Sequence, residues 1–535
     1  MKPRSRKSPF TLIVLTVAIA SPAGMTGSVH ADTGDACRIA TRPAVPGAAV
    51  TSMETTRKAA DAISKVPAHC EVTLTLTHPG AGDDVKVVVW LPSSGWNGRF
   101  QGTGGGGYSA GFLLGPVTPY LTLGAVPTLP AAVRQGYAAA ATDAGVGFNP
   151  ITPAPWALKS DGTVNTELLT NFAHRSVHDM TVAAKQIVAG FYGKPPSYSY
   201  WNGCSNGGRQ GLMEAQRHPT DYDGVVASAP ATNFDRFVPS EMWPQVVMND
   251  ERHFPSSCVF KTFTDAAVAA CDKDDGVADG IIDRPETCGF DPRSMIGKKV
   301  GCDFREKTLT AKDAEVVRRI WQGPISADGG RPLWYGLPKG ASFDVLAGTS
   351  FGRSGSPISM IADWVTYFLE KNPSFDTSTI TPARLESLIR QSRAEYNQII
   401  GADDPDLTAF KNAGGKIITW HGQADPLIFP QGTVDYYRRV QTAMGGAQET
   451  DSFYRLFLAP GVGHCGLLGA GGPVPDDALT ALVNWVEKGQ APATLPASVT
   501  DNGTRVTRDL CAYPKAARYN GQGDPKSAEN YHCAT

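Results

Sequence analysis

Three features of the chain predict an α/β fold with a mostly parallel sheet. Short β-branched or aromatic runs alternate with segments of helical periodicity before residue 232 and again after residue 407. Such alternation is typical of a parallel sheet with helices on both faces. Between these parts the alternation stops, and prolines, tryptophans and four of the ten cysteines gather. We therefore expect one domain built from residues 32–232 and 407–535, with a large lid domain inserted at 233–406.

The start of the chain has the pattern of an export signal. Four basic residues among the first seven precede an apolar run at 10–20, and small residues follow at 29–31. We expect residues 1–31 to be removed as a signal peptide and the protein to be secreted or periplasmic. The apolar run is about half the length of a bilayer-spanning helix. A soluble mature protein without a membrane partner is therefore expected.

Charge and cysteine content narrow the classes further. The chain has 49 basic and 51 acidic residues. Loss of residues 1–31 removes four basic side chains and leaves a net charge of about −6, without the basic stripe of a nucleic-acid-binding protein. The ten cysteines all follow the signal, which predicts five disulfides in an exported chain. Zinc is the alternative, but neither Cys-x-x-Cys nor His-Glu-x-x-His occurs.

The elements of the first half follow from local patterns. A β-branched run ending in Pro-Ser-Ser-Gly predicts a strand and a turn, and a glycine stands at 193, just after a helical segment, as a C-cap. A proline at 219 ends the helix that follows the next strand. The predicted strands are 85–91, 137–142, 197–204 and 224–226, and the predicted helices are 177–191 and 207–217.

After the insertion the alternation resumes. Strands are predicted at 416–420 and 453–458, and helices at about 432–444 and 476–488. The last helix has an acidic start and a basic end, which suit its dipole. Each of these two strands therefore ends in a loop at the same edge of the sheet as the loop after the strand at 197–204.

The candidate nucleophile is Ser205, in the sequence Gly203-Cys204-Ser205-Asn206-Gly207. A strand enters this Gly-x-Ser-x-Gly turn and a helix leaves it, as a nucleophile elbow requires. The same pattern surrounds Ser109 and Ser350, but neither has both flanks. The alternative is a tight strand–helix connection without catalytic use.

The acid and the histidine come from the two loops after the insertion. Asp425 and His464 follow the elbow in that order, and Ser, Asp, His is the order of the α/β-hydrolase fold. His464 would take the proton of Ser205, and Asp425 would hold the imidazole and stabilise the imidazolium. His421 also stands at a strand end, but it precedes the acid and would reverse the order.

A glycine run at 102–107 precedes the elbow and suits an oxyanion hole. Backbone N–H groups without side chains can approach a ligand closely. We take Gly105, from Gly104–Gly107, as one donor and the backbone N–H of Asn206, the residue after the nucleophile, as the other. A flexible loop is the alternative interpretation of the run.

Two cysteines flank the proposed catalytic residues. Cys204 precedes Ser205 and Cys465 follows His464, so the two sulfurs must be close if the serine and the histidine meet. A bond between them would close a loop of about 260 residues, worth roughly 5 kcal/mol on the loop-entropy model. It would also pin the elbow to the histidine loop.

The elbow Gly203–Gln210, Asp425 and Gly463-His464-Cys465 together resemble the tannase and feruloyl esterase family. The resemblance extends from about Cys37 to the C-terminus. It implies a secreted serine carboxylic ester hydrolase, with a lid, that cleaves esters of aromatic (phenolic) acids such as ferulate or gallate. The family also includes mono(hydroxyethyl) terephthalate hydrolase, so related aromatic esters are an alternative. We expect a monomer acting on a small-molecule ester.

The insertion contains an acidic loop that resembles the calcium loop of the family. The carboxylates of Asp272, Asp275 and Asp279, with the carbonyls of Val277 and Ile281, would suit structural Ca²⁺. The spacing departs from the EF-hand, and a solvated acidic turn is the alternative. The resemblance frames this loop with two cysteines, and the pairs expected besides Cys204–Cys465 are Cys37–Cys70, Cys271–Cys288, Cys511–Cys533 and Cys258–Cys302.

Two other function classes remain open. A catalytically silent, calcium-stabilised binding protein could keep the same fold, and a serine peptidase would differ in its lid and pocket. Trp364, Tyr367 and Phe368 could stack on a phenolic ring, but aromatic residues in such a segment are more often lid core.

Overall fold

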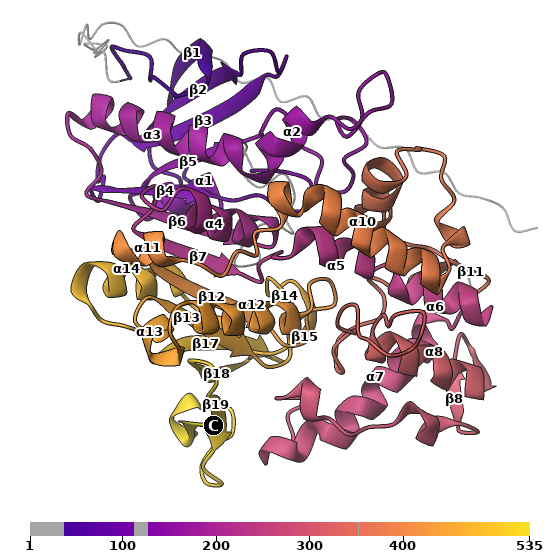
Figure 1. The fold of residues 1–535 in the computed structure, drawn as a ribbon. Helices are drawn as coiled ribbons and strands as arrows, with labels where there is room; N and C mark the ends of the chain where they lie inside the picture. Colours follow the sequence, from indigo (N-terminus) through magenta and orange to yellow (C-terminus); the bar gives the residue numbers. More distant parts are fainter. Residues whose placement is uncertain (1–36, 112–126, 351) are drawn as a thin grey trace, which may run out of the picture. The chain divides into compact units, whose positions relative to one another are not determined.

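The computed structural model describes residues 37–111, 127–350 and 352–535 (Figure 1). The expected signal peptide lies outside these residues. Within the described part, no helix has both the length and the apolar character needed to cross a membrane.

A nine-stranded sheet forms the centre of the fold (Figure 1). β1, β2 and β3 are each antiparallel to their neighbours, and β3 pairs antiparallel with β5. The six strands from β5 onward run parallel to one another. In spatial order the strands are β1 (Ala49–Lys58), β2 (His69–Thr77), β3 (Val85–Pro92), β5 (Ala138–Thr142), β4 (Arg99–Thr103), β6 (Tyr198–Cys204), β7 (Gly224–Ser228), β12 (Lys416–Gly422) and β13 (Tyr454–Ala459).

Helices cover both faces of the sheet, as the alternation predicted. On one face α3 (Ser176–Tyr192), α4 (Asn206–Arg217) and α12 (Pro430–Ala443) share a core with the strands. On the other face α1 (Leu129–Arg134) and α14 (Ala478–Lys488) do so. The predicted helix ends are close to the observed ones. Gly193 is the C-cap of α3, with φ of 70°. α12 begins two residues earlier than predicted, because proline fits a first helical position.

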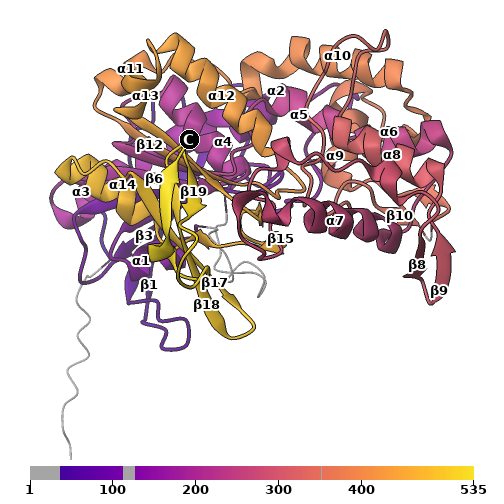
Figure 2. The ribbon, with the colours of Figure 1, turned by 90° about the horizontal axis from the view of Figure 1, so that it is seen from below.

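The insertion leaves and re-enters the sheet between neighbouring strands. β7 precedes it and β12 follows it, and the two strands pair in parallel. Its helices gather together in Figures 1 and 2. They are α5 (Phe234–Ser240), α6 (Trp243–Glu251), α7 (Ser257–Cys271), α8 (Ala311–Gln322), α9 (Ser359–Asp363) and α10 (Pro382–Ile400), with a hairpin of β8 (Lys299–Cys302) and β9 (Arg305–Thr308).

The aromatic residues of the insertion belong mainly to its core. Trp364 and Phe368 are fully buried, their rings stack at 4.4 Å, and Trp364 Nε1 donates to Ser392 Oγ. Tyr367 packs at the margin of this core. The interpretation of these side chains as lid core therefore holds for Trp364 and Phe368.

Short strands and disulfides complete the chain. β14 (Val462–His464) and β15 (Leu468–Gly471) form a hairpin, and β16 (Val474–Pro475), β17 (Thr494–Asp501) and β18 (Thr504–Cys511) form a small sheet before the β19 (Ala516–Tyr519) and β20 (Tyr531–Ala534) hairpin. All five expected disulfides are present: Cys37–Cys70, Cys204–Cys465, Cys258–Cys302, Cys271–Cys288 and Cys511–Cys533.

Candidate active site

Ser205 stands on a strained turn between strand and helix. β6 ends at Cys204 and α4 begins at Asn206, and between them Ser205 has φ of 62° and ψ of −124°. A non-glycine residue rarely adopts a positive φ, and such strain is typical of a nucleophile elbow. The flanking glycine is required, because a Cβ at Gly203 would lie 2.3 Å from the carbonyl oxygen of Gly207. The turn therefore has the geometry that the sequence predicted.

The two other serines with the same sequence pattern occupy different settings. Ser109 is fully buried and its hydroxyl donates to the carbonyl of Gly111. Ser350 lies in β10 (Thr349–Ser350), which pairs with β11 (Ser354–Gly355) in a two-residue hairpin. Neither serine stands between a sheet strand and a helix.

Asp425 lies in the loop after β12 and is completely buried. Its Oδ1 accepts hydrogen bonds from the backbone N–H groups of Leu427 and Ile428, at 2.8 and 2.9 Å. Burial alone raises the pKa of Asp425, but the charge and hydrogen bond of His464 and the hydrogen bond from His421 lower it well below its usual range. The carboxylate therefore stays ionised, as a triad acid requires.

His464 bonds to this carboxylate and is tied to the elbow. Its Nδ1 lies 2.8 Å from Asp425 Oδ2. With the Nδ1 proton held there, Nε2 keeps its lone pair to accept a proton. The next residue, Cys465, bonds to Cys204 with 6.1 Å between the two Cα atoms. No described contact joins Ser205 Oγ to His464, and such hydrogen bonds commonly tighten only in the substrate complex.

His421, weighed above as a rival base, occupies a supporting position. It is fully buried, and its Nδ1 lies 2.9 Å from Thr433 Oγ1. Its Nε2 lies 3.1 Å from Asp425 Oδ2 and 2.9 Å from the carbonyl of Ile428. Two histidines thus share one carboxylate oxygen. His464 comes from the loop beside the elbow, whereas His421 comes from β12 and fixes the carboxylate.

Asn206 has the position expected of an oxyanion donor. It is the first residue of α4, where backbone N–H groups lack intrahelical partners. Its side chain is committed elsewhere: Nδ2 donates to the carbonyl of Ser109 at 3.2 Å, and Oδ1 accepts from Arg209 Nε at 2.8 Å. Only the backbone N–H of Asn206 is therefore free for an oxyanion.

The prediction that Gly105 supplies the second donor is wrong. Its N–H donates to Gln210 Oε1 at 3.1 Å, and its carbonyl accepts from the N–H of Gly207 at 3.0 Å. Gly105 is buried and serves to hold the glycine run against α4, whereas the next residue, Gly106, is partly exposed. The sequence showed the run but not which amide the helix already occupies.

Arg209 and Gln210 lie near the start of α4, and their roles become visible only in the fold. Gln210 bridges to the glycine run, since Oε1 accepts from Gly105 and Nε2 donates to the carbonyl of Ala110 at 2.9 Å. Arg209 is fully buried and also donates to the carbonyls of Ala173 and Phe172, at 2.7 and 3.3 Å. Both side chains therefore position the groups around Ser205.

Arg209 is a buried cation without an acidic partner. Among the described residues no carboxylate forms an ion pair with it, and its guanidinium lies 5.5 Å from the ring centroid of Phe172 and 5.9 Å from that of Phe234. Burial lowers its pKa to about 9. A positive charge thus lies next to Asn206, whose backbone N–H is the candidate oxyanion donor.

In the acidic loop of the insertion, the predicted carboxylate ligands bond to backbone N–H groups and to one arginine. Asp272 Oδ1 accepts the backbone N–H groups of Asp279, Gly280 and Ile281, at 3.0, 2.8 and 3.3 Å. Asp275 Oδ1 accepts the N–H of Val277 at 2.9 Å, and Asp279 Oδ2 lies 3.3 Å from Arg508.

The carboxylate of Asp283, two residues after Ile281, adjoins this loop. Both oxygens of Asp283 are buried without a hydrogen bond, and the nearest cation, Arg518, lies 3.6 Å away. Burial and the charge of Asp275 raise the pKa of Asp283 to about 6. Under-compensated carboxylate oxygens fit a hard cation.

The sheet and these residues define a class of protein. A serine on a strained elbow, a buried carboxylate bonded to a histidine, and that histidine tied to the elbow are the arrangement of the α/β-hydrolases.

Comparison with known proteins places the chain within this class. It belongs to the tannase and feruloyl esterase family, whose model matches residues 70–534. A probable feruloyl esterase of Arthroderma benhamiae is 44% identical over 98% of both chains. The mono(2-hydroxyethyl) terephthalate hydrolase of Piscinibacter sakaiensis is 32% identical over 88% of this chain and 85% of that one.

A solved structure agrees with the sequence relatives. The tannin acyl hydrolase of Aspergillus niger superposes with a TM-score of 0.81, at 27% identity, over 92% of both chains. The protein is therefore a carboxylic ester hydrolase.

Proposed function

We propose that this protein cleaves esters of aromatic, phenolic acids such as ferulate or gallate through a Ser-His-Asp acyl-enzyme mechanism. The observation that carries the mechanism is the Cys204–Cys465 bond, which ties the strained Ser205 turn to the loop of His464. The support for the substrate class is that relatives are named feruloyl esterase and tannin acyl hydrolase.

Each residue of the site has a step in this mechanism. Ser205 Oγ attacks the ester carbonyl while His464 Nε2 takes its proton, and ionised Asp425 stabilises the imidazolium. The backbone N–H groups of Asn206 and Gly106 would bind the oxyanion. The ester C–O bond breaks, and the alcohol leaves with the proton from His464. Water then attacks the acyl-enzyme by the same route and releases the acid.

A related aromatic ester is the second candidate substrate. The 32% identical relative is named for mono(2-hydroxyethyl) terephthalate, which is also an ester of an aromatic acid. We further propose that the protein acts as a monomer outside the cytoplasm. The export pattern at residues 1–31 and the five disulfides support this location.

Substitution of the nucleophile tests the mechanism. Ser205→Ala should lower turnover of methyl ferulate, methyl gallate or mono(2-hydroxyethyl) terephthalate by about 10⁴-fold or more, with an unchanged melting temperature. The panel should include a peptide amide, whose turnover would favour a peptidase. Wild-type protein inactive on the whole panel would support a silent binding protein, and more than a few per cent activity in the variant would exclude Ser205 as the nucleophile.

We propose in addition that the acidic loop binds a structural Ca²⁺. Asp272, Asp275 and Asp279, with the carbonyls of Val277 and Ile281, would hold it, and the unpartnered oxygens of Asp283 support a cation there. None of these residues belongs to the triad. The ion would neutralise the mutual repulsion of the carboxylates and so stabilise the folded chain.

Metal content and melting temperature test this site. Purified protein should contain calcium, and a chelator should lower the melting temperature by several degrees. Asp275→Asn should remove most of the bound calcium and the response to chelator, because it deletes a ligand charge. Asp274→Asn, at the exposed neighbouring position, is the matched control and should change neither. A calcium-free wild-type protein that ignores chelator would contradict the proposal.

A further inference from the structure

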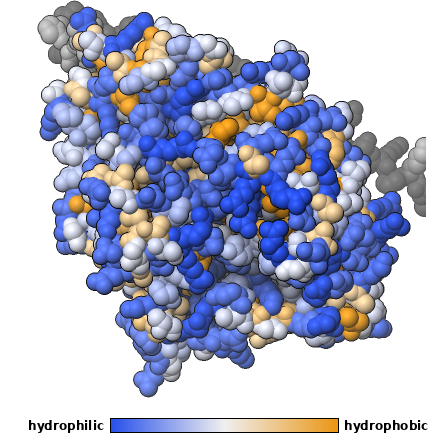
Figure 3. Space-filling view, in the orientation of Figure 1, coloured by the Kyte–Doolittle hydropathy of each residue, from blue (hydrophilic) through white to orange (hydrophobic). Residues whose placement is uncertain are grey.

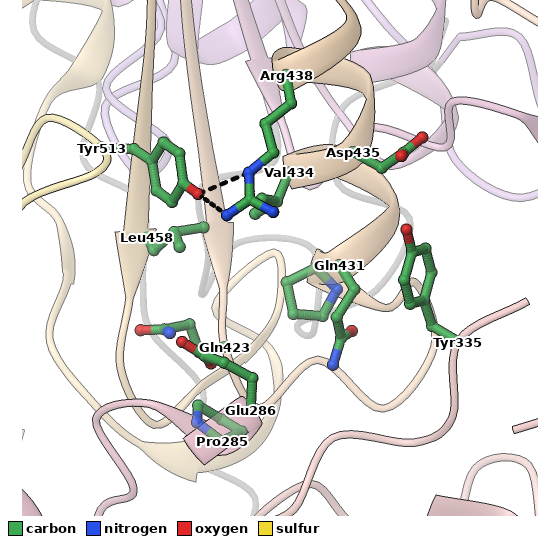
Figure 4. Close-up of a pocket in the computed structure, with 11 residues that line it drawn as sticks. Pro285, Glu286, Tyr335, Gln423, Gln431, Val434, Asp435, Arg438, Leu458 and Tyr513 are labelled. Atoms are coloured by element: carbon green, nitrogen blue, oxygen red, sulfur yellow. Dashed lines mark hydrogen bonds between the residues drawn. The ribbon is translucent and has the colours of Figure 1, made fainter. Parts of the chain in front are cut away.

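A pocket that no triad residue lines opens between the hydrolase domain and the insertion. It is a cavity of about 210 Å³. The start of α12, the end of β13 and the segment after β18 form one side, and two segments of the insertion close the other (Figure 4). Neither Ser205, Asp425 nor His464 lines it.

The pocket continues into a second compartment. An adjoining cavity, also of about 210 Å³, shares five lining residues with the first: Glu286, Gln423, Arg438, Leu458 and Tyr513. Each compartment is smaller than the roughly 300–1,000 Å³ that drug-sized ligands occupy. The pair suits a ligand of two small linked units.

Polar groups in the first compartment have capacity that the protein leaves unused. Gln431 Oε1 is buried there without a hydrogen-bond partner among the described residues. Arg438 donates to the phenol oxygen of Tyr513, at 3.0 Å from Nε and also from the guanidinium end. It forms no ion pair with a described carboxylate. A buried amide oxygen without a partner calls for a ligand or water donor.

The charges of the pocket oppose an ionic ligand. The lining of the two compartments carries charges of both signs: the acids are Asp283, Glu286 and Asp435, and the bases are Arg284, Arg438, Arg508 and Lys515. Three of them are already paired within the protein, Asp435 with Arg439 at 3.1 Å, Asp283 with Arg518 at 3.6 Å and Arg508 with Asp279 at 3.3 Å. A carboxylate or phosphate would meet the acids, and a cation would meet the bases. The ligand that matches is therefore neutral and carries several hydroxyl groups.

Aromatic faces complete the recognition. Tyr335 and Tyr513 stand on opposite sides of the cavity in Figure 4, with Gln423 and Glu286 at its lower end. Rings of this kind offer an apolar face with a polar edge. Flat polar side chains around such faces match a sugar ring, which has apolar C–H faces and a rim of hydroxyls.

We propose that this pocket is a saccharide-binding site that takes a neutral disaccharide unit, with one ring in each compartment. Gln431 Oε1 accepts a hydrogen bond from a sugar hydroxyl in the first compartment. Arg438 and Gln423 line both compartments and donate hydrogen bonds to the two rings. The proposal does not rest on the hydrolytic chemistry, because no triad residue takes part. Since both domains line the site, an occupied pocket also braces the insertion against the hydrolase domain.

Binding to Ser205→Ala protein tests the proposal without interference from turnover. Calorimetry should show binding of a neutral disaccharide such as xylobiose or cellobiose, weaker binding of xylose, and a rise in melting temperature with the disaccharide. Ferulate and inorganic phosphate are the comparison ligands. No saccharide binding at 50 mM, on the order of the weakest affinities worth measuring, would overturn the site, as would preference for ferulate or phosphate.

Matched glutamine variants locate the binding. Gln431→Leu should weaken disaccharide binding by about tenfold, because it removes the unpartnered acceptor while keeping the side-chain volume. Gln441→Leu, on the same helix but outside the pocket, should bind like the parent. Turnover of methyl ferulate by both variants in the Ser205 background should stay within about twofold of the wild-type rate. Equal loss of binding in the two glutamine variants would contradict the assignment.

Discussion

Arg209 is a fully buried side chain that holds Asn206, the residue after the candidate nucleophile. Its guanidinium bonds to the side chain of Asn206 and to two carbonyls of the segment before α3, and no described carboxylate neutralises it. An unpaired buried cation is costly to the fold. In the proposed mechanism, negative charge develops beside Asn206 as Ser205 attacks, and the nearby guanidinium would stabilise it. We therefore propose that Arg209 both orients Asn206 and stabilises this charge.

We predict that Arg209→Met lowers kcat about 10- to 100-fold and changes KM little, because the lost stabilisation belongs to the transition state. Arg209→Lys should recover part of the rate, since it restores the charge but not the fork of hydrogen bonds. Arg217→Met, at the other end of α4, is the control and should keep the parent kcat. A rise in KM alone would show that Arg209 serves substrate binding.

At the scale of elements, the site is assembled by the ends of neighbouring strands. Parallel pairing of β6, β7, β12 and β13 brings the loops of the serine, acid and histidine to one edge of the sheet. The Cys204–Cys465 bond then fixes the elbow to the hairpin of β14 and β15. In the proposed mechanism a proton passes between the two residues next to this bond, Ser205 and His464, whereas Cys511–Cys533 joins only the C-terminal strands.

Removal of the two disulfides should therefore have different effects. Cys204→Ala with Cys465→Ala should cut turnover on the order of 100-fold, since a shift of about 1 Å between nucleophile and base has that effect. Unfolding should remain cooperative, because four disulfides and the core persist. Cys511→Ala with Cys533→Ala should lower the melting temperature and leave kcat near the parent value. Equal kcat in the two double variants would show that the bond at the elbow has only a structural role.

At the scale of the whole molecule, one partly buried histidine cluster is expected to make stability depend on pH. The face in Figure 3 is mostly hydrophilic, with hydrophobic side chains in small groups. Against α3 and α4, His178, His218 and Asp221 place possible metal-ligand atoms together, yet the two rings stack nearly parallel at 3.8 Å, so their lone pairs do not converge. We interpret this cluster as a proton-sensitive packing site.

The pKa shifts of His218 and of His174, whose ring lies beside it, set the direction of the pH effect on stability. Burial, with nearby positive charges, lowers the pKa of His174 to about 3 and that of His218 to about 4. The unfolded chain binds these protons near pH 6.5, so stability falls as pH drops from about 6.5 toward 4. His178 has the opposite effect, because its hydrogen bond to Asp221 raises its pKa. It therefore adds stability at low pH, and this stability is lost as the pH rises through its folded-state pKa.

We predict that lowering the pH from 7 to 5 shifts the melting temperature of wild-type protein downward relative to that of His218→Asn. The variant lacks one group that must stay neutral in the folded state. His532→Asn, at an exposed position on β20, is the control and should follow the wild type. An identical shift in His218→Asn and wild type would assign the acid sensitivity to other groups.

The sequence by itself determined the features that depend on neighbouring residues. Strand and helix alternation, the glycines around Ser205, the order Ser205, Asp425, His464 and the adjacent cysteines are all local patterns, and the sheet and the five disulfides agree with them. The helices of the insertion could not be predicted from periodicity. Their apolar faces pack on one another, and the sequence does not show which helices are neighbours in that core.

Tertiary structure decided the partners of buried polar atoms. Whether the N–H of Gly105 is free, which histidines bond to Asp425, and whether Arg209 meets a carboxylate depend on residues distant in the chain. Gln210 and Gly105 stand 105 positions apart, and His464 and Asp425 stand 39 apart. A residue type fixes what a group can donate or accept, but only packing fixes which distant group is within 3 Å or so to receive it.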